Sequence, residues 1–156
     1  MTATAAASLA ALLACAVLGA PPSVRAQTAP TAADSAAITR AALDYIEGWY
    51  AGDAARMERA LHPELAKRMV YRPAKAGAHP QLDQQSAMTL VQHTRAGGGK
   101  DTPKDKQQKD VTILDVYRNA ASAKIVASGW IDYLHLVRAD KGWQIINVLW
   151  ELKPEG

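Results

Sequence analysis

The chain has 156 residues and a formal net charge of +3 at pH 7, with 18 Lys and Arg against 15 Asp and Glu. Charges of both signs are spread along the chain, which excludes the basic footprint of a nucleic-acid-binding protein, so we expect no nucleic-acid partner. The only cysteine, Cys15, lies near the N-terminus, so disulfides and thiol chemistry are excluded from the rest of the chain.

Residues 1–26 are predicted to form a signal peptide. Residues 8–20 are an apolar run that is too short for a membrane span of about 20 residues. The small residues of Val24-Arg25-Ala26 follow this run and are typical of a signal-peptidase cleavage site. We therefore expect export to the periplasm or the extracellular space. An alternative is a lipoprotein acylated at Cys15, because the two kinds of signal share this composition.

Residues 27–35 are predicted as a flexible spacer and residues 36–153 as a single domain of ordinary length. The first helix has Asp34 or Ser35 as its expected N-cap. Gly52 stands at the position where a left-handed residue ends a helix. The apolar residues of this helix recur at helical spacing: Ile38, Ala42, Tyr45, Ile46 and Trp49.

A second helix is expected directly afterwards, with Asp53 as its N-cap and its inward face formed by Met57, Ala60 and Leu61. Pro63 interrupts the helical pattern, and it either ends this helix or begins another turn. A short strand is predicted at residues 68–72. Residues 74–82 contain glycine and proline and are predicted as a loop.

The third helix is predicted to begin at Asp83 or Ser86, to end at Arg95, and to bury Met88, Val91 and Leu90. The run Gly97–Gly99 then stops the helix. A phosphate-binding loop would need Ser or Thr after the next lysine, where Asp101 stands, and it would open a helix instead of ending one. We therefore interpret the glycines as a helix terminator.

The C-terminal part is predicted to be a sheet. Residues 100–110 form a polar, solvated connection, and residues 111–117 form a strand. Two long strands follow, at residues 122–136 and 143–152, with apolar side chains at nearly every position. A hairpin with one wet face would alternate apolar and polar residues, so we expect helices to cover one face and a second subunit or a pocket to cover the other. Helices followed by consecutive strands indicate an α+β fold.

This layout resembles the putative lumazine-binding family of the nuclear-transport-factor-2-like (NTF2-like, or SnoaL-like) superfamily. The matching segments are Asp44–Tyr50, Gly52-Asp53, Ala60–Leu65, Thr94–Gly99, Ile113–Tyr117, Trp130–Leu136 and Trp143–Trp150. The resemblance implies a cone-like curved antiparallel sheet wrapped around the N-terminal helices, with a pocket inside. The superfamily includes isomerases, dehydratases, cyclases and non-catalytic domains, so the fold alone does not identify the chemistry.

Asp132 and His135 are candidate catalytic residues, as an acid/base pair in an apolar pocket. On a regular strand these two residues lie on opposite faces, and a bulge near Gly129 would be needed to bring them together. Tyr133 and His135 are two residues apart, so they share a face that could line the interior. The alternative is that these polar groups are hydrogen-bonded within a core or a dimer face.

Four tryptophans and five tyrosines, with no phenylalanine, suit a cavity that binds a flat ring, because these side chains combine an aromatic surface with a polar group. The expected ligand-binding residues are Tyr45, Trp49, His93, Trp130, Tyr133 and Trp150. Ordinary core packing is the alternative. The four histidines have no close-paired spacing, so we expect neither a bound metal nor another cofactor.

The sequence therefore predicts an exported homodimer that pairs through its sheet and binds a small organic molecule without changing it. A second hypothesis is an isomerase or lyase that uses Asp132 or His135 as its acid/base group. A third is a non-catalytic dimeric assembly module. A cavity smaller than about 300 Å³ would favour this third hypothesis.

Overall fold

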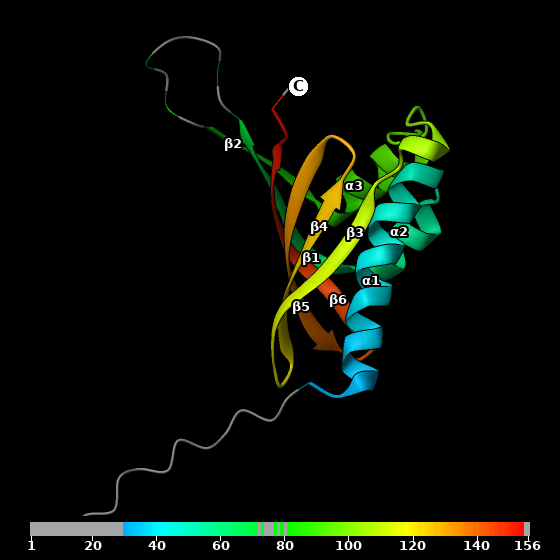
Figure 1. Cartoon of the computed structure of the whole chain (residues 1–156), viewed down its shortest axis with the longest axis vertical. Helices are drawn as coiled ribbons and strands as arrows, with labels where there is room; N and C mark the ends of the chain where they lie inside the picture. Colours follow the sequence, from blue (N-terminus) through cyan, green and yellow to red (C-terminus); the bar gives the residue numbers. More distant parts are fainter. Residues whose placement is uncertain (1–29, 72, 74–76, 78, 80, 155–156) are drawn as a thin grey trace, which may run out of the picture.

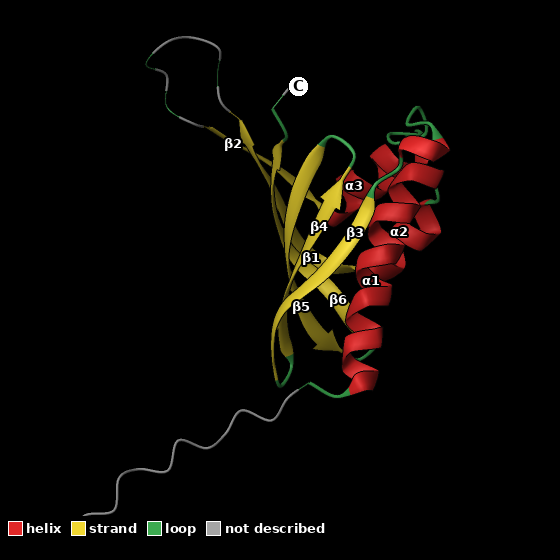
Figure 2. Ribbon diagram, viewed as in Figure 1, coloured by secondary structure: helices red, strands yellow, loops and turns green. Residues whose placement is uncertain are grey.

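The structure, a computed structural model, describes residues 30–71, 73, 77, 79 and 81–154. Figure 1 shows a curled sheet with the helices gathered along one face, and Figure 2 separates the two layers by colour. The fold is α+β, as predicted. The predicted signal peptide, residues 1–26, lies outside the described residues. Of the helices described, none is both long and apolar enough to cross a membrane.

The first helix, α1, spans Ala32–Ala51, and Thr31 is its N-cap. The Thr31 hydroxyl accepts from the backbone N–H of Asp34 at 3.1 Å. The helix therefore begins before the predicted cap at Asp34 or Ser35, and residues 32–35 belong to it instead of to a spacer. Gly52 ends the helix with φ of 66°, as predicted, because glycine adopts this left-handed conformation at little cost.

Asp53 is the N-cap of α2, Ala54–Ala60, and its carboxylate accepts from the backbone N–H of Arg56 at 2.9 Å, as predicted. The helix gives way at once to β1, Leu61–Tyr71. Pro63 therefore lies inside a strand, at the irregularity where the pairing of β1 is interrupted between Leu61 and Ala66. Proline lacks a backbone donor, so such an interruption is where a strand tolerates it.

A second strand, β2, occupies Gln81–Ser86 and pairs antiparallel with β1. The prediction of a loop at residues 74–82 was therefore wrong for its last two residues, and the strand itself was missed. β2 is polar because it lies at the edge of the sheet and most of its residues are exposed. An edge strand of this composition can pair on one side without burying apolar side chains.

Helix α3 spans Ala87–Arg95 and begins at Ser86, whose hydroxyl accepts from the backbone N–H of Thr89 at 3.2 Å. Leu90 and Val91 are buried, but Met88 is 74% exposed. The prediction that Met88 is buried was therefore wrong. A short 3₁₀ turn, Lys104–Lys106, follows α3.

Four strands complete the sheet: β3 Lys109–Tyr117, β4 Ala120–Ala127, β5 Trp130–Ala139 and β6 Gly142–Leu152. The sheet order is β2-β1-β6-β5-β4-β3. Every neighbouring pair is antiparallel except β1 and β6, which are parallel. The C-terminal strand therefore lies inside the sheet.

The segment predicted as one strand at 122–136 is two strands separated by Ser128 and Gly129. A residue of α1 stabilises this turn: the backbone N–H of Ser128 donates to the Tyr50 hydroxyl at 3.0 Å. The Ser128 hydroxyl in turn accepts from the backbone N–H of Gln108 at 3.0 Å. These bonds connect residues far apart in the sequence, so no local pattern indicated the break.

The core lies between the helices and the face of the sheet that they cover. Helix α1 packs against β3, β4 and β6, and α3 packs against β1 and β2. The largest fully buried apolar side chains are Ile38, Ile46, Met57, Ile125, Leu134, Leu136, Ile145 and Val148. Burial alternates along β4 and β5, so each strand directs every second residue inward. The opposite face is partly open: Tyr133 is 51% exposed and Leu149 is 41% exposed.

Candidate functional site

A cavity of about 350 Å³ lies between the helices and the sheet. Five of the six predicted ligand-binding residues line it: Tyr45, Trp49, His93, Trp130 and Trp150. They come from α1, α3, β5 and β6, so the cavity forms only when the complete fold brings these elements together. That these side chains contact a ligand stays a prediction.

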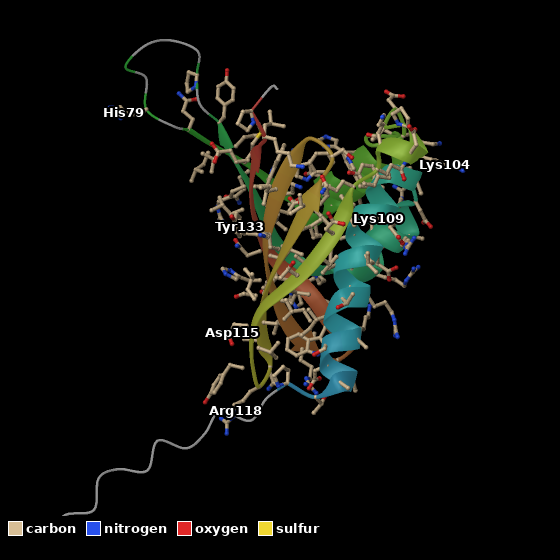
Figure 3. The ribbon with its side chains drawn as sticks, in the orientation of Figure 1. His79, Lys104, Lys109, Asp115, Arg118 and Tyr133 are labelled. Atoms are coloured by element: carbon tan, nitrogen blue, oxygen red, sulfur yellow. The ribbon has the colours of Figure 1, made fainter. Side chains whose placement is uncertain are left out.

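The sixth residue, Tyr133, lies on the other face of the sheet. Figure 3 shows its side chain directed away from the helices, as is that of Asp115. His135 is also exposed on this face, where its Nδ1 lies 3.3 Å from the Asn147 side-chain amide. The expectation that Tyr133 and His135 line the interior was therefore wrong. The alternation of β5 directs Asp132 and Leu134 inward and Tyr133 and His135 outward.

Asp132 is fully buried behind the cavity-lining residues Tyr45, Lys67 and Trp130 and is surrounded by donors. Its Oδ1 accepts from the Tyr45 hydroxyl at 3.2 Å and lies 3.4 Å from the Lys67 Nζ. Its Oδ2 accepts from the Trp130 Nε1–H at 2.7 Å. A buried carboxylate needs such partners to remain charged. Asp132 and His135 are thus separated by the sheet and do not form the acid/base pair considered from the sequence.

Lys67 was missed by the sequence analysis, and it is the central cation of the site. It comes from β1 and is only 7% exposed, yet it lines the cavity. Its Nζ donates to the Tyr45 hydroxyl and lies 4.8 Å from the centre of the Trp150 ring. The strand was predicted to begin at Arg68, one residue too late to include Lys67. The inward position of Leu65 could have indicated it, because residues two apart share a face.

The electrostatics of the site follow from its burial. Burial lowers the pKa of Lys67, because an ammonium loses hydration there, and the attraction of Asp132 opposes this effect. Burial raises the pKa of Tyr45 well above its ordinary value, and the Asp132 carboxylate raises it further, by charge repulsion and by accepting the phenolic hydrogen bond. The hydroxyl of Tyr45 therefore stays protonated, with an amine on one side and a carboxylate on the other.

Trp49 is held at the cavity by the glycine run that follows α3. A Cβ built on Gly98 would lie 2.6 Å from Cζ3 of Trp49, and one built on Gly99 would lie 2.6 Å from Nε1 of the same ring. No side chain fits at such distances, so the indole packs directly on glycine backbone. The glycines therefore do more than stop the helix, because they also form part of the cavity wall.

Two further tryptophans form the sheet side of the cavity. The rings of Trp130 and Trp150 have centroids 6.4 Å apart and meet edge to face at 72°. Tyr50 packs against the Trp130 ring with centroids 6.0 Å apart. Such aromatic pairs hold one another in place. The cavity therefore offers indole surface on the helix side and on the sheet side.

The histidines lie apart in the fold. His62 Nδ1 accepts from the backbone N–H of Glu64 at 3.2 Å, His93 faces the cavity, and His135 lies on the outer face. Within the described part of the chain, no group of three or more His, Cys, Asp or Glu side chains could hold a metal ion. The expectation that no metal is bound stays a prediction.

Three solved structures show the same fold. An NTF2-like protein of unknown function from Silicibacter pomeroyi is 16% identical, with a TM-score of 0.60 over 80% of this chain and 99% of that chain. One from Shewanella baltica is 19% identical, with a TM-score of 0.59 over 81% of this chain and 99% of that chain. One from Methylobacillus flagellatus is 19% identical, with a TM-score of 0.62 over 80% and 96%. At these identities the likeness concerns the fold alone.

A search of curated proteins found no match to this chain. The sequence model of one family, described as putative lumazine-binding, matches residues 33–151. This range extends from the first turn of α1 almost to the end of β6 and includes every residue of the cavity wall except Leu152. The fold is NTF2-like, and the chain belongs to the putative lumazine-binding family.

Proposed function

We propose that this protein binds a small organic molecule with a flat ring in the cavity between its helices and its sheet. The observation that carries this proposal is a cavity of about 350 Å³ with Trp49, Trp130 and Trp150 in its walls. That volume falls within the range of about 300–1,000 Å³ that is usual for small-molecule sites. It therefore does not favour the hypothesis of an assembly module without a ligand.

The polar groups of the cavity restrict the kind of ligand. Lys67 is the only Lys or Arg among the described residues that line it, and the ammonium is already close to Asp132. The pair is electrically neutral, so a ligand needs no full negative charge. A ring that bears a carbonyl oxygen suits this wall, because the oxygen can accept from Lys67 while the ring packs against indole.

Isothermal titration calorimetry and thermal shift would test the proposal, with lumazine, riboflavin and salicylate as probes. Lumazine is the first choice because of the family's description. We expect at least one probe to raise the melting temperature and Trp49→Leu to weaken that effect. Trp143→Phe is the matched control, because Trp143 is not among the residues that line the cavity. No binding of any probe, or equal loss in both variants, would count against the proposal.

We further propose that the protein is exported and that residues 1–26 are removed. The apolar run and the small residues at 24–26 support this proposal. Expression of the full chain in a bacterial host should give a mature protein that begins at Gln27. A lipid-modified protein that begins at Cys15 would establish the anchored alternative, and a cytoplasmic protein that retains Met1 would exclude both.

We also propose that two copies pair through the outer face of the sheet. Tyr133 and Leu149 are cross-strand neighbours there, both exposed, beside a shallow hollow of about 210 Å³. Light scattering after gel filtration should give a dimer mass for the natural protein and a monomer mass for Leu149→Glu. Met88→Glu, on the helix side, is the control and should stay dimeric. A monomeric natural protein would exclude the pairing.

A further inference from the structure

Lys67 differs from an ordinary buried lysine in what surrounds its amine. Its Nζ lines a cavity, donates to the Tyr45 hydroxyl, and lies 3.4 Å from the Asp132 Oδ1. The other side of this carboxylate is occupied by the Trp130 indole. The amine is thus flanked by one group that can donate a proton and one that can accept a proton, on the wall of a cavity.

We propose that Lys67 forms a reversible imine with an aldehyde or ketone bound in the cavity. This inference rests on the proposed binding function, because the same cavity must admit the carbonyl compound. It goes further by naming the reactive group of the ligand and the atom that it meets. A primary amine is the one side-chain group that condenses with a carbonyl in this way.

The first step adds the amine to the carbonyl. Lys67 releases its extra proton to solvent, and the neutral Nζ attacks the carbonyl carbon to form a C–N bond. The electron pair of the C=O double bond moves to the oxygen, which takes a proton from the Tyr45 hydroxyl. The nitrogen then loses one proton, which returns through Asp132 to Tyr45. The Asp132 carboxylate is within reach of this proton, at 3.4 Å from Nζ.

The second step removes water. The nitrogen loses its second proton and supplies its lone pair to form the C=N bond. The C–O bond breaks, and the oxygen leaves as water with the two protons that the amine has lost. Neither an oxidant nor a reductant is needed. Tyr45 and Asp132 end the sequence in their original protonation states, so they serve as positioning and proton-transfer groups.

The surroundings favour this reaction at Lys67 over the surface lysines. Burial lowers the pKa of Lys67, which raises the fraction of neutral amine, although Asp132 works against this. The side chains of Lys106 and Lys109 are 73% and 46% exposed. The aromatic walls would also concentrate a flat carbonyl compound beside Lys67. Neither Lys106 nor Lys109 lines this cavity.

The test is reductive trapping on the whole purified protein. Naphthaldehyde and the smaller benzaldehyde are added separately with sodium cyanoborohydride, which reduces an imine to a stable amine. Peptide mapping then measures the labelling rate at each lysine. We expect Lys67 to react at least about tenfold faster than Lys106 or Lys109. An aldehyde bound in the cavity is already held beside the Lys67 amine, whereas a surface lysine must meet the aldehyde by diffusion. Naphthalenemethanol, which cannot form an imine, should protect Lys67 alone.

Tyr45→Phe provides the second measurement. This variant should slow labelling at Lys67 several-fold and leave the rates at Lys106 and Lys109 unchanged. If both aldehydes leave Lys67 unlabelled, imine formation there is excluded, and if they label Lys67 no faster than the surface lysines, the proposed role of the cavity is excluded. The calorimetric probes can bind without forming an imine, so failure of this inference is distinguishable from failure of the proposed function.

Discussion

Lys67 and Asp132 meet across β6: Lys67 belongs to β1 and Asp132 to β5, and the two strands are separated by β6 in the sheet. Their charged atoms are 3.4 Å apart, and both side chains are almost completely buried. Trp150 lies between them on β6, opposite Asp132 in the β5–β6 pairing. The pair therefore ties three strands together at the cavity wall.

Replacing one member of this pair should lower the free energy of unfolding more than replacing both members does. Lys67→Met leaves a buried carboxylate without its cation, and we expect a loss of about 3–5 kcal/mol in the free energy of unfolding. The double variant Lys67→Met with Asp132→Leu should lose clearly less than the sum of the single variants, because no unpaired charge remains. Urea denaturation measures all of these values. Strictly additive losses would contradict the coupling.

The stabilising effect of Tyr45 should disappear in alkali. Tyr45→Phe removes a hydrogen bond to a buried carboxylate, which is worth about 1.5–3 kcal/mol. The folded pKa of Tyr45 is raised above its ordinary value of 10.0, so its contribution is complete below pH 10 and is lost as the pH rises towards the folded pKa. The stability gap between wild type and variant should shrink by about 1.4 kcal/mol per pH unit above 10. Urea titrations at successive pH values would reveal this trend, and a constant gap would contradict it.

The sequence predicted the helix ends best, because caps are local. Gly52, Asp53 and Ser86 act at the positions expected, and their side chains or backbone bond within a few residues. The strands were predicted less well. The break at Ser128 depends on Tyr50, and β2 exists because β1 pairs with it, so both depend on partners far away in the sequence.

The candidate site could be predicted only in part, because its composition can be read from the sequence but its long-range contacts cannot. The abundance of tryptophan and tyrosine, with no phenylalanine, indicated a cavity, and Trp49, Trp130 and Trp150 line one. Which polar residues of β5 face the core depends on the register of the strand in the sheet. The apolar run along this part of the sequence gave no indication of that register. Lys67 was missed because its strand was predicted to begin at Arg68, whereas β1 begins at Leu61. Neither the pairing with Asp132 nor the contact with Tyr45 has a local sequence signal.

Gly98→Ala should disturb the packing of the Trp49 indole against the glycine backbone. The added methyl group would overlap the indole ring, and we expect a loss of about 1–3 kcal/mol, as for other overpacked sites. The emission of Trp49 should also shift as the ring moves. Gly129→Ala is the matched control, since nothing lies within 4 Å of its added Cβ. Thermal unfolding and tryptophan emission measure both effects. Equal effects of the two substitutions would argue against this packing.

Arg56 should contribute more stability than an exposed ion pair does. Its Nε donates to Asp44 at 2.7 Å, a second nitrogen donates to Glu47, and its side chain is 30% exposed. We expect Arg56→Met to cost about 1 kcal/mol, reduced in high salt by screening.

Lys106→Met is the comparison for this prediction. The Lys106 Nζ lies 3.8 Å from Asp105 in a pair whose side chains are 73% and 75% exposed. This substitution should cause no measurable change. Urea denaturation at low and high salt would compare the two variants, and a salt-independent loss for Arg56→Met would point to packing as its cause.

The internal place of β6 has a consequence for how the protein is made. Until residues 142–152 have been synthesised, β1 and β5 lack the strand that lies between them and joins them in the sheet. Pairing between such distant segments is slow, so the sheet closes late, after β6 has been made. If residues 1–26 direct export as proposed, this delay keeps the chain in the extended form that a secretion channel threads, and the domain closes only after it has crossed.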